Sequence, residues 1–225
     1  MSAKDRMAVL SAIMDQGLIP VFYHPDEEIC IRVIQACADG GAKCVEFTNR
    51  GDFAPHVFLA VARHFAKADD SVVMGVGSVV DAPTAGLYIA NGARFVVGPT
   101  LNPDVAKVCN RRKIPYSPGC GSASEISFAE ELGCEIVKLF PGSSVGGPEF
   151  VKAILGPMPW TRIMPTGGVD TSQASLKAWF DAGIVACGIG SNLITKELLA
   201  AKDYDGIEKK VRQTVAYIKS IRGKP

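Results

Sequence analysis

Short apolar runs alternate with longer amphipathic segments along the whole chain. Each interval between two runs holds a loop and one segment with apolar residues at helical spacing, for example 29–38, 57–66, 122–132 and 172–180. Alternation of strand and helix is typical of parallel strands joined by right-handed crossovers. The eight apolar runs begin roughly 20 to 29 residues apart and are residues 18–23, 43–48, 72–76, 94–97, 114–117, 135–140, 161–165 and 184–188.

Eight strand–helix units in 225 residues predict one α/β domain over residues 1–225, a closed (β/α)8 TIM barrel. Met7, Leu10 and Met14 lie at helical spacing and predict an amphipathic helix before the first strand. No linker rich in Pro, Gly or Ser and no block of charge marks a domain boundary. An open, doubly wound parallel sheet is the alternative architecture.

Four glycines set a common register for alternate strands. Each ends a predicted helix and leads directly into a strand, and glycine there accommodates the left-handed backbone of a helix end: Gly41, Gly92, Gly133 and Gly183. The third residues after them are all apolar: Cys44, Phe95, Ile136 and Ala186. The fifth residues are Glu46, Val97, Lys138 and Gly188. Alternate residues of a strand share a face, so Glu46 and Lys138 are expected inside the barrel, on opposite walls near its C-terminal mouth.

A glutamate and a lysine are not expected in a buried layer unless they are paired or have a function. One interpretation is an ion pair that fixes the register of the barrel. The other is a Schiff-base lysine with a carboxylate that moves protons. Burial of Lys138 among apolar neighbours would lower the pKa of its amine and favour the nucleophilic form. Glu46 would then transfer protons while the carbinolamine loses water.

Further polar residues follow the strands at the same mouth. Arg50 lies four residues after Glu46, and a guanidinium suits bidentate binding of a carboxylate; a solvent-exposed loop arginine is the alternative. Ser78 ends the third strand. Segments 165–170 and 188–191 place glycines after the seventh and eighth strands, where barrels commonly bind phosphate on backbone amides. Tight turns without a ligand are the alternative for these two segments.

Charge and hydropathy narrow the classes of partner. Lys and Arg total 24 and Asp and Glu 23, so the net charge of +1 gives no electrostatic reason to expect nucleic acid or a membrane surface as a partner. No apolar stretch approaches the length of about 20 residues that a membrane helix needs, and the first 16 residues do not resemble a signal peptide. The seven cysteines form no CxxC pair, which favours buried thiols in a reducing, cytoplasmic compartment.

No metal site or organic cofactor is predicted. His56 and His64 lie eight residues apart on one predicted helix, without a HExxH motif or an acidic cluster. His24 follows the first strand at the mouth, where it would either meet an anionic substrate or be solvated.

Several motifs together resemble the 2-keto-3-deoxy-6-phosphogluconate (KDPG) aldolase family, a group that includes 4-hydroxy-2-oxoglutarate (KHG) aldolases. The resemblance extends from about residue 18 to residue 193. It rests on Glu46-x-x-x-Arg50, on segments 75–78, 98–99, 117–119 and 137–141, and on Pro165-Thr166-Gly167-Gly168. Ser78 stands where well-known members carry threonine.

The resemblance implies a metal-free class I aldolase that splits a phosphorylated 2-keto-3-deoxy sugar acid into pyruvate and glyceraldehyde 3-phosphate. By this analogy Lys138 forms the imine and Glu46 is the general acid and base. Arg50, Ser78 and Pro99 would surround the pyruvyl group, and Thr166 would orient the aldehyde half. The phosphate would bind at Gly167, Gly168 and Ser191. The resemblance also implies a homotrimer.

Other functions remain as alternatives. An aldolase for another 2-keto-3-deoxy acid, such as the 6-phosphogalactonate epimer, would share most of these residues. A phosphate-binding barrel isomerase or synthase would use the glycine segments but would not need Lys138 opposite Glu46. A metal-dependent pyruvate aldolase would need carboxylate ligands at the mouth. A barrel that only binds a ligand is the non-enzymatic alternative.

Overall fold

Strands and helices alternate in the computed structural model, which describes residues 5–223; residues 1–4 and 224–225 of the expected domain lie outside the described residues. The strands are β1 (Leu18–Phe22), β2 (Cys44–Thr48), β3 (Val73–Gly77), β4 (Val96–Val97), β5 (Tyr116–Ser117), β6 (Gly119–Cys120), β7 (Val137–Leu139), β8 (Ile163–Pro165) and β9 (Cys187–Ile189). The helices are α1 (Arg6–Gln16), α2 (Glu27–Asp39), α3 (Ala54–Ala68), α4 (Ala82–Ala90), α5 (Pro103–Arg112), α6 (Ala123–Glu131), the 3-10 helix η1 (Ser143–Val145), α7 (Gly147–Leu155), α8 (Gln173–Asp181), α9 (Lys196–Ala200) and α10 (Tyr204–Ile221).

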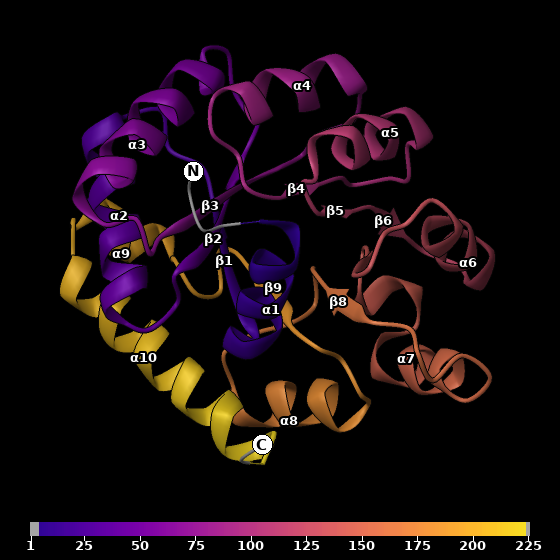
Figure 1. The fold of residues 1–225 in the computed structure, drawn as a ribbon. Coiled ribbons are helices and arrows are strands. Elements are labelled where there is room, and N and C mark those ends of the chain that lie inside the picture. Colours follow the sequence, from indigo (N-terminus) through magenta and orange to yellow (C-terminus); the bar gives the residue numbers. More distant parts are fainter. Residues whose placement is uncertain (1–4, 224–225) are drawn as a thin grey trace.

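The strands form two parallel sheets. The six-stranded sheet has the order β5-β4-β3-β2-β1-β9, and the three-stranded sheet has the order β6-β7-β8. Helices surround the strands, as expected for crossover connections that return each strand to the same end (Figure 1). The α/β class with parallel strands is therefore confirmed. None of the helices within residues 5–223 combines the length and apolar character needed to cross a membrane.

A further short strand, β6, follows the expected fifth strand (residues 114–117) on the other side of Pro118. β5 pairs with β4, whereas β6, on the other side of Pro118, pairs with β7. Proline has no backbone N–H to donate to a neighbouring strand, so the ladder ends there, although its carbonyl accepts a hydrogen bond from the backbone N of Lys138 at 2.9 Å. The prediction of eight strands in one closed sheet is thus corrected: within the described residues, nine short strands form two sheets.

The other junction between the sheets lies between β8 and β9. The backbone N of Val185 donates to the carbonyl of Ile163 at 3.0 Å, and Thr166 forms an isolated parallel bridge with Gly188. These contacts bring the end of β8 beside β9, although the two strands belong to different sheets.

The register predicted from the four glycines is confirmed. Gly41, Gly92, Gly133 and Gly183 all have positive φ, between 81° and 105°, which a side chain would disfavour. The four apolar residues three positions later all join one apolar cluster, which we call the inner core. Val97, at a fifth position, lies there too. A second cluster contains the residues between the strands and the surrounding helices.

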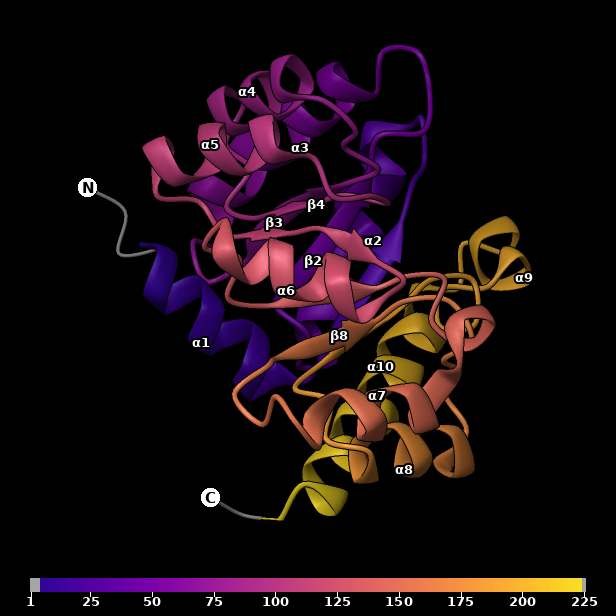
Figure 2. The same cartoon turned by 90° about the vertical axis from the view of Figure 1, so that its right-hand side faces the viewer.

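Helix α1 lies across one end of the strands, opposite the end near α9 (Figures 1 and 2). Val9, Leu10 and Ile13 are buried and belong to the inner core. The expected leading helix is confirmed, but its buried stripe differs from the predicted one, because Met7 is 67% exposed and Met14 is only partly buried. Facing the strand ends, α1 presents the stripe of residues 9, 10, 13 and 16. We infer that α1 closes the inner core at the end of the strands opposite α9.

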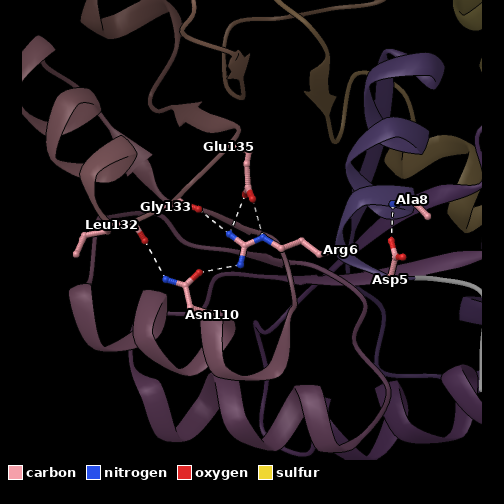
Figure 3. Close-up of polar contacts among 7 residues, drawn as sticks. All are labelled: Asp5, Arg6, Ala8, Asn110, Leu132, Gly133 and Glu135. Atoms are coloured by element: carbon pink, nitrogen blue, oxygen red, sulfur yellow. Dashed lines mark hydrogen bonds and ion pairs between the residues drawn. The ribbon is translucent and has the colours of Figure 1, made fainter.

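Hydrogen bonds fix both ends of α1. At its last residue, the buried side chain of Gln16 bonds the backbone of Leu18 and Cys44. At its first residue, the Arg6 guanidinium donates to Glu135 at 2.7 and 2.8 Å, to the side chain of Asn110 at 2.7 Å and to the carbonyl of Gly133 at 2.6 Å (Figure 3). Glu135 lies just before β7, so Arg6 links the closing helix to the strand that carries Lys138.

Replacing Arg6 by Ala should therefore destabilise the fold more than breaking an ordinary surface ion pair. The Arg6 side chain is 14% exposed, and its loss removes the guanidinium that bonds the Glu135 carboxylate and the side-chain oxygen of Asn110. We expect the free energy of unfolding in urea to fall by about 2 kcal/mol. Lys177→Ala, which removes an exposed pair with Asp181, is the control and should leave the free energy of unfolding almost unchanged. Equal losses in the two variants would contradict the role of Arg6.

Candidate active site

Glu46 and Lys138 lie at the centre of the candidate site, one on each sheet. Glu46 is on β2 in register with Val21 and Gly75, and Lys138 is on β7 in register with Gly119 and Met164. Both side chains are buried, at 2% and 5% exposure. Because residues two positions before each, Cys44 and Ile136, belong to the inner core, the strand alternation turns the two charged groups inward as well.

Burial dominates the ionisation of both groups. It raises the pKa of the Glu46 carboxyl, against the opposing effect of the positive charges of Lys138 and Arg50. It lowers the pKa of the Lys138 amine; Glu46 opposes this shift, and the positive charge of Arg50 adds to it. Among the described residues, the Oε2 atom of Glu46 has no hydrogen-bond partner. The pair therefore combines an amine that loses its proton more readily with a carboxyl that keeps its proton longer.

Two neighbours shape the space around this pair. The Nζ atom of Lys138 lies 4.7 Å from the centre of the Phe140 ring, a favourable position for a cation over an aromatic face. On the other wall, the Glu46 carboxylate lies so close to Gly77 that a Cβ atom at residue 77 would overlap it. The glycine at the end of β3 thus provides the space that the Glu46 side chain occupies.

Arg50 and Ser78 lie together beyond the ends of β2 and β3. The Nε atom of Arg50 is 3.4 Å from the Oγ atom of Ser78, and both residues reach solvent. Ser78 has a left-handed backbone with φ of 60°, which is uncommon for serine and directs its side chain toward Arg50. The charge of Arg50 acts on both Glu46 and Lys138. The structure therefore brings Arg50 and Ser78 beside the central pair.

The two glycine segments predicted to bind phosphate lie next to each other. Thr166 bridges Gly188, and the side chain of Asn192 donates to the carbonyl of Val169 at 3.3 Å. Gly167 and Gly168 both have positive φ, at 85° and 82°. The indole N–H of Trp179 on α8 donates to the carbonyl of Gly168 at 3.4 Å. The hydroxyl oxygen of Thr166 is buried and has no hydrogen-bond partner among the described residues.

Pro99, Ser191 and His24 lie on other loops at strand ends. The carbonyl of Pro99 packs against Gly119, the strand neighbour of Lys138. Ser191 is exposed directly after Gly190. His24 follows β1, and its Nδ1 atom accepts a hydrogen bond from the backbone N of Asp26 at 3.1 Å. No contact joins His24 to the central pair.

Four residues near the site were assigned no role from the sequence, although segments 75–78 and 137–141 are among the motifs that carry the family resemblance: Gly77, Phe140, Asn49 and Tyr88. Phe140 could have been found, because it lies two positions after Lys138 and shares its side of the chain. The role of Gly77 could not have been found from the sequence, because its proximity to Glu46 depends on the pairing of β2 with β3. The hydroxyl of Tyr88 donates to the side chain of Asn49 at 2.8 Å, a contact across 39 residues that no local pattern indicates.

Two observations concern regions outside this site. Among the described residues, no group of three or more His, Cys, Asp or Glu side chains could hold a metal ion. A groove of about 610 Å³ lies between α3 and α4, and its lining includes Arg63, Asp70 and Arg94 but none of the expected site residues.

The chain matches known proteins over most of its length. A model of the KDPG and KHG aldolase family matches residues 9–210. The chain is 31% identical over 212 residues to the 2-dehydro-3-deoxy-phosphogluconate aldolase of Haemophilus influenzae, which covers 94% of this chain and 97% of that protein. It is 30% identical over 198 residues to the KHG/KDPG aldolase of Escherichia coli K12, which covers 88% of this chain and 90% of that protein.

A solved structure shares the fold. The KDPG aldolase of Legionella pneumophila, described with pyruvate captured at low pH as a covalent carbinolamine intermediate, superposes with a TM-score of 0.82 at 24% identity. The superposition covers 91% of this chain and 96% of that chain. By the extent of the family match and by its identity to these relatives, the chain belongs to the KDPG and KHG aldolase family.

Proposed function

We propose that the chain is a class I aldolase that cleaves KDPG to pyruvate and glyceraldehyde 3-phosphate through an imine on Lys138. The observation that carries the proposal is a buried lysine whose pKa is lowered by burial, with a buried glutamate acting on it. The names of the H. influenzae and E. coli relatives support the substrate class. The second activity in the name of the E. coli relative favours KHG, which would yield pyruvate and glyoxylate, as a further substrate.

In the proposed reaction, Nζ of neutral Lys138 adds to the C2 carbonyl of the keto acid. Glu46 protonates the carbinolamine oxygen, water leaves and a protonated imine forms. Glu46 then accepts the proton of the C4 hydroxyl while the C3–C4 bond breaks. The electron pair of that bond passes to the imine nitrogen as the aldehyde departs. Protonation of the resulting enamine at C3, followed by addition of water to the imine, releases pyruvate and restores the amine.

The remaining residues would bind the two ends of the substrate. Arg50 and Ser78 offer a guanidinium and a hydroxyl to the carboxylate of the pyruvyl half, and Pro99 would line that pocket. Thr166, with its unpartnered hydroxyl, would orient the aldehyde half. Backbone amides at Gly167 and Gly168, with Ser191 from the adjacent loop, would bind the phosphate. His24 is not assigned a role in this scheme.

The architecture and assembly extend the proposal. We infer that the two sheets act as one closed barrel over a single domain of residues 1–225. The supporting contacts are the bond from Lys138 to Pro118 at one junction and the Thr166–Gly188 bridge at the other. A homotrimer and a cytoplasmic location stay predictions; the first rests on the family resemblance and the second on the seven dispersed cysteines.

The imine can be tested by trapping. Incubation of the protein with pyruvate and borohydride should add one reduced pyruvyl group at Lys138, identified by mass spectrometry of the digested protein. Lys138→Ala should abolish both the adduct and the cleavage, because Glu46, the other residue of the pair, has no amine that could form the imine. Lys177→Ala, on the surface of α8, is the matched control and should be modified at Lys138 as in the wild type. An unmodified Lys138 in the wild type would refute the proposal.

Replacement of Glu46 by Gln should separate imine formation from proton transfer. Cleavage should slow by about 10²- to 10⁴-fold, the usual contribution of a general acid and base. Trapping should persist with its pH midpoint shifted to lower pH, because Glu46 raises the pKa of Lys138 and its removal takes that effect away. Glu149→Gln on α7 is the control. A midpoint that moves to higher pH would contradict the assigned electrostatics.

The glycine segments should confer preference for a phosphorylated substrate. We expect kcat/KM for KDPG to exceed that for the unphosphorylated keto acid by at least about tenfold, the scale of hydrogen bonds to a charged group. Ser191→Ala should reduce only the value for KDPG, whereas Ser220→Ala on α10 should change neither. Equal efficiency with both substrates, measured as pyruvate release, would count against the phosphate assignment.

A further inference from the structure

The position of Arg50 is determined mainly by its backbone. Its side chain reaches solvent, and its Nε atom donates to the Ser78 hydroxyl at the long distance of 3.4 Å. The backbone N of Arg50 donates to the carbonyl of Thr48 at 2.9 Å, at the end of β2. A flexible side chain on a fixed turn samples fewer positions than one on a mobile loop, so the residues that hold this turn control where the guanidinium lies.

The turn is held from the interior through Asn49. The backbone N of Asn49 donates to the carbonyl of Gly77 at 2.9 Å, and its side-chain oxygen accepts the hydroxyl hydrogen of Tyr88 at 2.8 Å. Tyr88 is on α4 and is fully buried. Its ring packs edge-to-face on Phe58, with centroids 5.1 Å apart, which restricts the motion of the hydroxyl.

The turn also contacts Tyr23, at Gly51. Its hydroxyl lies so close to Gly51 that a Cβ atom there would overlap it. The Tyr23 ring packs on Phe47 with centroids 5.6 Å apart, and Phe47 in turn packs on Phe58 at 5.7 Å. The Arg50 turn therefore contacts two tyrosines, and both are supported by the same aromatic cluster.

We propose that Tyr88, through its hydrogen bond to Asn49, is a positioning residue for Arg50 and thereby sets the affinity of the site for the carboxylate of a 2-keto acid. This inference rests on the proposed function, because it assigns the carboxylate to Arg50. Tyr88 itself has no part in the proton transfers, since it reaches the mouth only through Asn49.

The test is Tyr88→Phe, which keeps the buried ring and removes the hydroxyl. The pyruvate concentration that gives half-maximal borohydride trapping should rise by about two- to tenfold, the scale of one lost hydrogen bond. The trapping rate at saturating pyruvate should match the wild type. Loss of stability alone would lower the melting temperature and leave the half-saturating concentration unchanged, so all assays are run well below the melting temperature of the variant.

A second variant tests the route through Asn49. Asn49→Leu should raise the half-saturating concentration to a similar extent, and addition of Tyr88→Phe to it should cause no further rise, because the hydroxyl then has no partner. Thr214→Val is the control: it removes a buried hydroxyl that donates to the carbonyl of Lys210 on α10, far from the mouth, and should leave the half-saturating concentration unchanged.

The outcomes distinguish this inference from the proposed function. An unchanged half-saturating concentration in Tyr88→Phe, or additive effects in the double variant, would overturn the positioning role while wild-type trapping continued. Absence of an adduct at Lys138 in the wild type would instead refute the aldolase proposal itself, before any variant is compared.

Discussion

The burial of Lys138 is the constraint on which the rest of the structure depends. An ammonium removed from water loses hydration free energy, so an apolar interior favours the neutral amine. The inner core provides these apolar surroundings for the lysine, and α1 closes the core at the end of the strands opposite α9. Glu46 opposes the shift without cancelling it, because its own charge is disfavoured by the same burial. A wetter core would return both groups to ordinary surface ionisation and remove the reactive amine.

Much of this arrangement could be predicted from the sequence, because it depends on local periodicity. The glycines at helix ends fix where each strand begins, and the two-residue repeat of a strand then decides that Glu46 and Lys138 turn inward. The interruption at Pro118 could not be predicted with the same certainty, since its effect depends on which strands lie on either side. The stripe of α1 that is buried also depends on its docking angle. The Tyr88–Asn49 contact joins residues far apart in the chain, and only the packing of α4 against the β2 turn brings them together.

The two ends of the site differ in how they are built. The end proposed to bind the pyruvyl group consists of side chains on β2, β7 and the turn after β2, which the aromatic cluster and the sheet hold in place. The other end consists mainly of backbone at Gly167 and Gly168, supported by Trp179 and Asn192. In the proposed mechanism, the side chains at the first end therefore determine the reaction, whereas the backbone conformation of the loops at the second end determines which aldehyde half of the substrate can bind. This division allows relatives in one family to differ in substrate while they retain the same chemistry.

The position of α1 has a consequence for the order of events. Because the helix closes the inner core at one end, we infer that molecules enter and leave the site at the mouth formed by the strand ends. In the proposed mechanism the pyruvyl group stays attached to Lys138, deeper than the aldehyde half. The aldehyde must then leave before water can enter to hydrolyse the imine. Geometry thus makes the departure of the two products sequential, with the covalently held one last.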